Sequence, residues 1–151
     1  QLYAVSREII CESDVTELKV KLEKQYCRIN VMVVGLDCRV RIRGDVMGID
    51  MNDLTPLPGL FCVEQSPVID IHSKSQHFVF DVPRQIDDSL MLEMVVESSG
   101  LSPVYTYDLG KRLMESGVDW NKPSLDDVYV NIEYMDNKFV FEIQNWDKIE
   151  L

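Results

Sequence analysis

The sequence predicts an all-β fold, an antiparallel β-sandwich with one short helix. Many short runs alternate apolar and polar residues with the period of two that is typical of half-buried strands. Glycine, proline, Asn and Asp interrupt these runs at nearly regular spacing, as turns in a sandwich do. Only one segment has helical spacing. We expect a single domain over residues 1–151, because this length with 46% hydrophobic content can form one core.

The first third of the chain contains four expected strands. Residues 2–10 are strand-like, within a strand or linker at residues 1–15, and residues 18–22 alternate apolar residues with lysines as a half-buried strand does. Residues 26–34 form a longer run. The turn residues that follow predict a hairpin into residues 38–43.

A row of three arginines, Arg39, Arg41 and Arg43, lies along one face of the expected strand at residues 38–43, because alternate side chains share a face. We interpret this row as a solvated outer face whose charge is offset by carboxylates. Binding of an acidic partner is the alternative.

The middle of the chain alternates short strands with breaks. Pro56 and Pro58 lack the backbone donors of an interior strand, so residues 54–59 are expected to form a crossing loop. Short strands are expected at residues 60–63 and 68–71.

A charged corner, VPRQIDDSLML at residues 82–92, joins two cleanly alternating runs. Residues 78–82 alternate up to Pro83, and residues 90–96 resume the alternation. We expect these two runs to pair as antiparallel neighbours.

The expected helix covers about nine residues, with Asp108 as N-cap and Gly117 as the stop; its apolar positions are Leu109, Leu113 and Met114.

The clearest hairpin of the sequence lies near its end. Residues 128–134 and 139–143 alternate, and Asp136 and Asn137 supply a two-residue turn of the favoured type.

Charge excludes nucleic acid as a main partner. The formal net charge is -11, whereas phosphate binding needs clustered Lys and Arg. Residues 87–151 hold 5 Lys and Arg against 14 Asp and Glu, so the acidity is concentrated there. No stretch approaches the roughly 20 apolar residues of a spanning helix.

The four cysteines form no CxxC pair and lack zinc-finger histidines, so no metal site is expected. We favour free thiols over disulfides, since the sequence selects none of the three pairings that four cysteines allow. Cys27 and Cys38 lie in apolar runs that bury a thiol.

No catalytic pattern is present, and neither an enzymatic activity nor a cofactor is expected. His72 and His77 have the wrong spacing for a metalloprotease helix, and we interpret them as surface or edge-strand residues. The adjacent pairs at residues 87–88 and 126–127 are interpreted as turn caps, with calcium binding by loop carboxylates as the alternative.

The aromatic residues are interpreted as core and rim packing of a sandwich, with a sugar-stacking platform as the alternative. The set comprises Tyr105, Tyr107, Trp120, Tyr129, Tyr134 and Trp146.

An ordered series of motifs resembles the FimB-type fimbrial anchor family of Bacteroidia, which builds type V fimbriae. The motifs run the length of the chain: LYAVSRE (2–8), KQYCRINVMV (24–33), IRGDVMGIDMN (42–52), LTPLPG (54–59), VPRQIDDSLML (82–92), YDLGKRLMESGVDW (107–120) and IQNWD (143–147). The resemblance implies a transthyretin-like β-sandwich that is the C-terminal domain of a two-domain lipoprotein. Cys11 follows REII rather than the small residues of a lipidation site. Either the lipidated N-terminal domain lies upstream and is absent from this chain, or this is not a membrane anchor.

The family resemblance implies a subunit that anchors a fimbria to the outer membrane at the cell surface, limits its length and binds shaft or accessory subunits. Such subunits assemble by strand donation, in which an extended segment completes a neighbour's sheet. We expect the edge at the terminal hairpin or at residues 2–10. The hairpin candidates are Val128, Val130, Ile132, Phe139, Phe141 and Ile143.

Alternative functions are a fimbrial stalk subunit, a tip adhesin that binds a host or glycan receptor, and a generic surface β-sandwich binding module.

Overall fold

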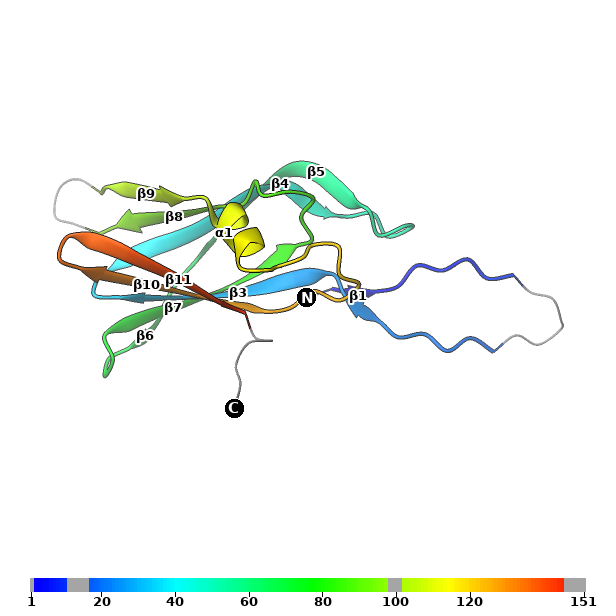
Figure 1. The fold of residues 1–151 in the computed structure, drawn as a ribbon, viewed down its shortest axis with the longest axis horizontal. Coiled ribbons are helices and arrows are strands. Elements are labelled where there is room, and N and C mark those ends of the chain that lie inside the picture. The colour runs from blue at the N-terminus through cyan, green and yellow to red at the C-terminus, as the bar shows by residue number, and fades with distance from the viewer. Residues whose placement is uncertain (1, 11–16, 98–101, 146–151) are drawn as a thin grey trace.

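Two β-sheets packed face to face form the body of the protein in the computed structural model, which describes residues 2–10, 17–97 and 102–145 (Figure 1). One sheet has the strand order β11-β10-β3-β7-β6, and the other has the order β5-β4-β8-β9. The expected all-β sandwich with a short helix is confirmed. The elements are β1 (Tyr3–Ala4), β2 (Glu23–Lys24), β3 (Tyr26–Val34), β4 (Cys38–Ile49), β5 (Pro56–Gln65), β6 (Val68–Asp70), β7 (Ser75–Pro83), β8 (Met91–Val96), β9 (Val104–Tyr107), α1 (Leu109–Glu115), β10 (Val128–Met135) and β11 (Lys138–Asn145).

The core lies between the sheets and consists of the apolar members of the alternating runs. The alternation buries every second side chain because successive side chains point to opposite faces of a strand. Side chains with at most 1% exposure come from both layers: Ile29, Val31, Val33, Phe78, Phe80, Val82, Val40, Ile42, Leu92 and Met94.

The sheets are antiparallel except where β10 lies parallel to β3, with Val128 beside Ile29 and Ile132 beside Val33. Residues between α1 and β10 bring the chain back to the start of β3, so β10 enters the sheet in the same direction. We expected an antiparallel sandwich, and among the described strands the parallel pair of β3 and β10 departs from that expectation.

Two predicted strand pairs are wrong. β3 and β4 do not form a hairpin, because Gly35 to Asp37 carry the chain from one sheet to the other. Likewise β7 and β8 lie in opposite sheets, and the corner between them crosses the sandwich with Leu90 fully buried. Alternation shows that one face of a strand is buried. Because strands of both sheets bury a face against the same core, alternation does not show which sheet a strand belongs to.

The proline-containing segment is a strand and not the crossing loop that we expected. Pro56 and Pro58 belong to β5, where they lie opposite Ile49 and Val46. The pairing shifts register between Gly44 and Val46 and again between Val46 and Gly48. Proline is tolerated because β5 is an edge strand, which needs donors on one side only.

The N-terminal strands are much shorter than predicted. Only Tyr3 and Ala4 of residues 2–10 form a strand, which pairs with β2. Residues 17–22 form no strand, and their side chains are exposed. We define the N-terminal arm as residues 5–10 together with 17–22. Figure 1 shows the arm projecting beyond one end of the sandwich.

The helix ends as predicted but begins without its expected cap. Gly117 has φ +96°, its N–H donates to the carbonyl of Met114, and Val118 N–H donates to Leu113. This is a Schellman stop. Asp108 precedes the helix, but its side chain makes no capping hydrogen bond. In the described part of the chain, no helix has the length and apolar character to cross a membrane.

The terminal hairpin is confirmed. β10 and β11 pair over their whole length, and Met135 lies opposite Lys138. Asp136 and Asn137 have φ of 51° and 59°, which are the positive values of a type I′ turn.

The arginine row lies on the outer face of its sheet, as expected. Arg43 Nε lies 2.8 Å from Glu93, which also pairs with Arg41, and Arg39 lies 3.4 Å from Glu64. These carboxylates come from the neighbouring strands β8 and β5. The positive charge of the arginine row is therefore balanced by carboxylates of the same sheet.

Candidate functional site

The four edges of the two sandwich sheets differ in their capacity to accept another strand. β5 carries prolines and register shifts, which are common ways of protecting an edge. β6 and β9 contain three and four residues. β11 contains eight residues, pairs with β10 without a shift and includes no proline. Among the described strands, β11 therefore offers the longest regular edge.

The register of the hairpin determines which groups of β11 face outward. In a two-residue hairpin, the residues that flank the turn exchange hydrogen bonds, here Met135 and Lys138. Every second residue from Lys138 therefore bonds to β10. The remaining residues, Phe139, Phe141 and Ile143, direct their backbone N–H and C=O groups away from β10. We call this row of groups the β11 edge.

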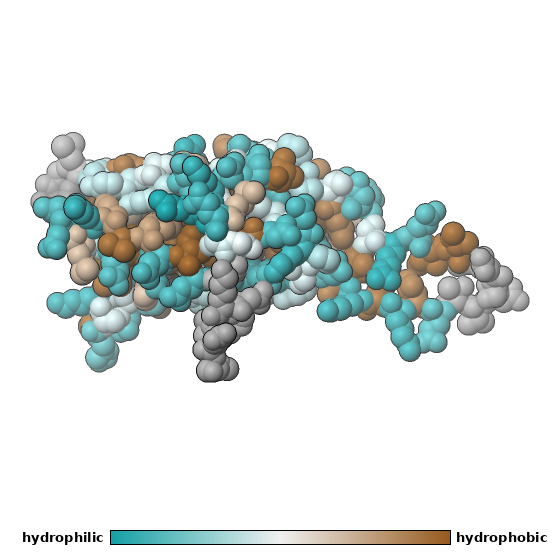
Figure 2. All heavy atoms as spheres, in the orientation of Figure 1, coloured by the Kyte–Doolittle hydropathy of each residue, from teal (hydrophilic) through white to brown (hydrophobic). Residues whose placement is uncertain are grey.

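The side chains of the β11 edge close one side of the sandwich. Phe139 lies 4.7 Å from the ring centroid of Tyr105, and Phe141 stacks on Tyr107 at 4.9 Å. Tyr134 packs against Phe139 at 4.9 Å. β9 and β11 thus meet across the gap between the two sheets. In Figure 2, hydrophobic residues reach the surface over the strands that Figure 1 labels β10 and β11.

This aromatic cluster agrees with core and rim packing. Trp120 is buried in the core cluster as well, with 5% exposure. Tyr129 is on β10 with 36% exposure, and Trp146 lies outside the described residues.

The six predicted partner residues divide into two groups. Val128, Val130 and Ile132 have 0% exposure and belong to β10, which is paired on both sides. A protein that adds to the sheet cannot contact them in this fold. Phe139, Phe141 and Ile143 are half-buried and lie on the open edge. The structure therefore leaves the second group as the candidate site.

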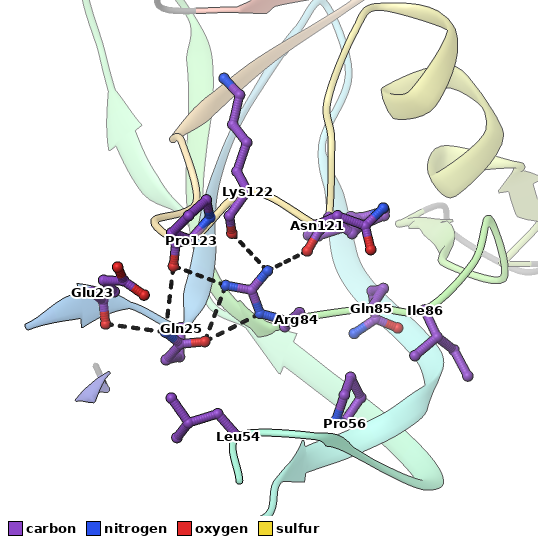
Figure 3. A pocket seen from close by; sticks show the side chains of 11 residues that line it. Glu23, Gln25, Leu54, Pro56, Arg84, Gln85, Ile86, Asn121, Lys122 and Pro123 are labelled. Atoms are coloured by element: carbon purple, nitrogen blue, oxygen red, sulfur yellow. Dashed lines mark hydrogen bonds between the residues drawn. The ribbon is translucent and has the colours of Figure 1, made fainter. Parts of the chain in front are cut away.

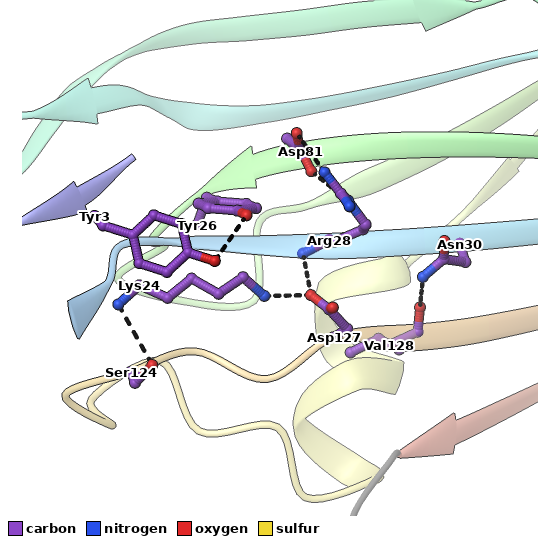
Figure 4. A network of polar contacts seen from close by, with 9 residues as sticks. All are labelled: Tyr3, Lys24, Tyr26, Arg28, Asn30, Asp81, Ser124, Asp127 and Val128. Atoms are coloured by element: carbon purple, nitrogen blue, oxygen red, sulfur yellow. Dashed lines mark hydrogen bonds and ion pairs between the residues drawn. The ribbon is translucent and has the colours of Figure 1, made fainter. Parts of the chain in front are cut away.

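A salt-bridged network fixes the start of the hairpin beside β3 (Figure 4). Asp127, directly before β10, pairs with Lys24 and accepts a hydrogen bond of 3.3 Å from the backbone N–H of Arg28. The Arg28 side chain pairs in turn with Asp81 of β7 at 2.9 Å. These contacts connect β2, β3 and β7 with the residue directly before β10, so they hold the start of the hairpin beside β3.

Tyr26 and Tyr3 meet edge to face beside this network, 5.8 Å between ring centroids. The hydrogen bond to the Tyr3 hydroxyl, followed by burial, raises the pKa of Tyr26 to about 12. The phenol of Tyr26 is therefore neutral at physiological pH, and the pair joins β1 to β3.

A hollow of about 370 Å³ surrounds Arg84 (Figure 3). The guanidinium donates to the amide oxygen of Gln25 and to the carbonyls of Trp120, Lys122 (2.8 Å) and Pro123 (3.1 Å). Burial lowers the pKa of Arg84. Because its donors point at protein oxygens, Arg84 serves to connect segments of the fold, and the hollow has little means of binding an anion.

The residues with potential metal or nucleophilic chemistry are dispersed. His72 and His77 are exposed, as expected, and Ser75 Oγ lies 2.9 Å from His77. Cys27, Cys38 and Cys62 are free thiols, while Cys11 lies outside the described residues. No group of three or more His, Cys, Asp or Glu is placed to hold a metal ion within the described ranges.

The carboxylate pairs behave partly as predicted. Asp87 accepts a hydrogen bond from the backbone N–H of Ser89, 3.0 Å away, which is the expected turn cap. Asp126 and Asp127 instead form ion pairs with Lys122 and Lys24.

The sequence analysis did not predict β9, and it did not place the two tyrosines of this strand beside the terminal hairpin. The stretch Val104–Tyr107 alternates β-branched and aromatic residues, a composition that favours strands. That signal was present, but four residues are too few to identify a strand by alternation alone.

The chain is similar to known proteins in its fold and not in its sequence. No family model matches the chain, and no curated protein matches it by sequence. Among solved structures, the fimbrial anchor protein Mfa2 from Porphyromonas gingivalis matches with a TM-score of 0.60 and 12% identity, covering 83% of this chain and 48% of that one. The similarity confirms that this chain shares the fold of a fimbrial anchor protein, as the sequence resemblance implied.

Two candidate cell adhesion proteins match at lower scores. That of Bacteroides uniformis has a TM-score of 0.47 and 10% identity, covering 83% of this chain and 52% of its own. That of Bacteroides fragilis has a TM-score of 0.48 and 13% identity, covering 86% and 48%. The chain therefore spans about half the length of the structures that it matches.

Proposed function

We propose that this chain is part of a non-enzymatic fimbrial anchor or assembly subunit, which attaches a fimbria to the outer membrane and limits its length. The observation that carries the proposal is an open and regular strand edge on the fold of a fimbrial anchor. Phe139, Phe141 and Ile143 offer unpaired backbone groups at the β11 edge, where a segment of another subunit can add as a strand. Backbone hydrogen bonds supply the affinity, and the neighbouring aromatic side chains supply specificity.

Attachment to the membrane is assigned to a part of the protein that precedes this domain. In this proposal the present chain is the C-terminal domain of a two-domain lipoprotein at the cell surface. The half-length coverage of the Mfa2 structure supports this organisation.

Deleting the gene tests the anchoring role. We expect longer fimbriae that are shed, so that fimbrial protein moves from the cells into the medium. Fimbriae that stay attached at normal length would overturn the proposal.

Restoring the gene with variants of Ile143 tests the β11 edge. Ile143→Pro removes an outward N–H without removing a bond to β10, whereas Ile143→Ala shortens the side chain and keeps the N–H. We expect Ile143→Ala to restore attachment and Ile143→Pro to fail, with both proteins folded by circular dichroism. A proline at Val130 is not a suitable test of the edge. Val130 lies on β10, which is paired on both sides, so a proline there would disturb the fold itself.

A second candidate function, a fimbrial tip adhesin that binds a glycan, is favoured by one observation. A hollow of about 320 Å³ lies on the outer face of the β11-to-β6 sheet, and its lining combines apolar residues such as Met32 and Val79 with Asn30, Tyr129, Asn131 and Gln144. Amides and an aromatic ring suit a sugar, so binding on a glycan array that is lost in Asn131→Ala would support the adhesin.

A further inference from the structure

The hairpin formed by β6 and β7 exposes three large apolar side chains near its tip. Val68, Ile69 and Ile71 have exposed fractions of 73%, 62% and 83%. Large apolar residues gathered on one exposed element, away from the core, are a feature of interaction surfaces. Figure 1 shows this hairpin diverging from the body of the sandwich at the edge of its sheet.

The exposure of Ile69 follows from the position of the hairpin in the sheet. Ile69 lies opposite Gln76, so both side chains are on the same face, the one that turns toward the core. Gln76 is buried and accepts a hydrogen bond of 3.0 Å from the backbone N–H of Cys38. Ile69 lies one strand further out and is not covered by the second sheet, and Ile71 follows it into the turn.

The turn satisfies many of its polar groups internally. Asp70 accepts hydrogen bonds from the Ser73 hydroxyl at 2.7 Å and from the backbone N–H of His72 at 2.9 Å, and these bonds lower its pKa. The Ser73 hydroxyl also lies 2.7 Å from that of Ser75, which in turn lies 2.9 Å from Nε2 of His77. Polar groups that are already hydrogen-bonded to each other cost less to remove from bulk water.

The hairpin is electrically neutral in a protein of net charge -11. Within residues 66–77 the charges of Asp70 and Lys74 cancel when the histidines are neutral. Lys74 is exposed at the end of the turn, where its carbon chain can lie along apolar surface while the ammonium reaches a phosphate. The acidity that opposes the approach of the protein to a phosphate-bearing surface is therefore balanced in this element.

The shape of the tip favours a lipid surface over a protein partner. Side chains that are exposed by 62–83% protrude from the molecule, so a protein would need a matching pocket for each of them. A lipid headgroup layer is fluid and surrounds protruding apolar side chains without a fitted pocket. At this depth the outer backbone groups of β6 keep contact with water, as they could not in the hydrocarbon centre.

We propose that the tip of the β6–β7 hairpin binds the surface of a lipid bilayer, with Ile69 and Ile71 at the boundary between headgroups and acyl chains. This inference goes beyond the proposed function, which assigns attachment to a part of the protein that precedes this domain. The hairpin is a second, non-covalent contact, and it determines which side of the domain faces the membrane.

Flotation of the purified chain with phosphatidylcholine vesicles tests the proposal. We expect the chain to float with the vesicles. Ile69→Asn and Ile71→Asn are each expected to lower the partition coefficient about tenfold, because each removes one large apolar side chain from the boundary. Ile71→Trp should bind at least as strongly as the unmodified chain, because an indole ring suits the membrane interface. All three variants should keep the melting temperature, since both positions are exposed.

Leu60→Asn is the matched control, because Leu60 is 77% exposed on β5, in the other sheet. It should float as the unmodified chain does. A chain that stays out of the vesicle fraction, or an equal loss in Leu60→Asn, would overturn the inference. Loss of binding in Ile71→Trp would do so as well, because a fitted pocket rejects the larger side chain and a fluid layer does not.

Sedimentation velocity without lipid covers the remaining occupant, a second copy of this chain. Self-association that Ile71→Asn abolishes would assign the tip to that copy and overturn the lipid contact. We expect no such association through the tip. Fimbrial release from cells is measured separately, so the proposed function can survive a negative result with vesicles.

Discussion

The guanidinium of Arg84 binds the amide oxygen of Gln25 through two nitrogens, Nε at 3.1 Å and Nη2 at 3.0 Å, although the residues are 59 positions apart. Gln25 lies directly before β3, and Arg84 lies directly after β7. The same guanidinium reaches carbonyls of the loop before β10, including Pro123. One half-buried cation with neutral acceptors therefore joins three segments that lead into the sheet of the β11 edge.

Replacing Arg84 with lysine is expected to lower the free energy of unfolding by about 1–3 kcal/mol, because an ammonium cannot reproduce the planar fork and buried carbonyls lose their donors. Urea denaturation measures the effect. Arg112→Lys, on the exposed face of α1, is the control and should change stability by less than about 0.5 kcal/mol. Equal effects of the two substitutions would contradict the role assigned to Arg84.

Gly110→Ala should destabilise the protein, although alanine normally favours a helix. A Cβ atom at Gly110 would lie 2.3 Å from the carbonyl oxygen of Asp88, which is backbone and cannot move independently. We expect a loss of about 1–3 kcal/mol from overpacking, seen as a lower melting temperature. Gly48→Ala is the matched control, since a Cβ there meets no atom within 4 Å. A stabilised Gly110→Ala variant would show that α1 is not held against the corner.

The turn of the terminal hairpin depends on left-handed backbone at Asn137, whose φ is 59°. Asn137→Val should cost about 1–2 kcal/mol, because a β-branched residue is strained there, whereas Asn137→Gly should preserve or raise stability. Thermal unfolding of the two variants separates turn geometry from the loss of the Tyr134 hydrogen bond, which both variants remove. Equal melting temperatures for the two variants would argue against the I′ turn.

Alkaline pH should weaken the fold partly through Cys27. Burial raises the pKa of its thiol from 9.0 to about 12, so the folded state keeps the proton that the unfolded state releases. The contribution of the protonated Cys27 thiol to the free energy of unfolding is fully present below about pH 9 and falls as the pH rises towards 12. Urea denaturation at several pH values should show the stability advantage over Cys27→Ala shrinking across this range. A constant difference would mean that the thiol does not ionise on unfolding.

Alternation in the sequence identified most of the buried strands. β3 was predicted with its observed ends, and the pairing of β10 with β11 followed from the turn at Asp136 and Asn137. The stop of α1 at Gly117 was also predictable, because a Schellman motif is a local structure. These features depend on residues that are neighbours in the chain.

The arm shows the limit of the same reasoning. Leu18, Val20 and Leu22 predicted a half-buried strand, yet the structure exposes them and uses only Tyr3, Ala4, Glu23 and Lys24 as strands at this end. Period-two alternation indicates a face that can be buried, and it contains no information on which surface buries it.

By itself the sequence determined most of the long strands, which of their faces are apolar, where the helix stops and where the last hairpin turns. Only the tertiary structure decided that β3 and β4 lie in opposite sheets, that β10 runs parallel to β3, and that β11 ends its sheet. Pairing depends on the packing of distant segments around one core, through contacts such as Asp127 with Lys24. An open edge is a property of the assembled sheet, so no single strand's sequence could have located it.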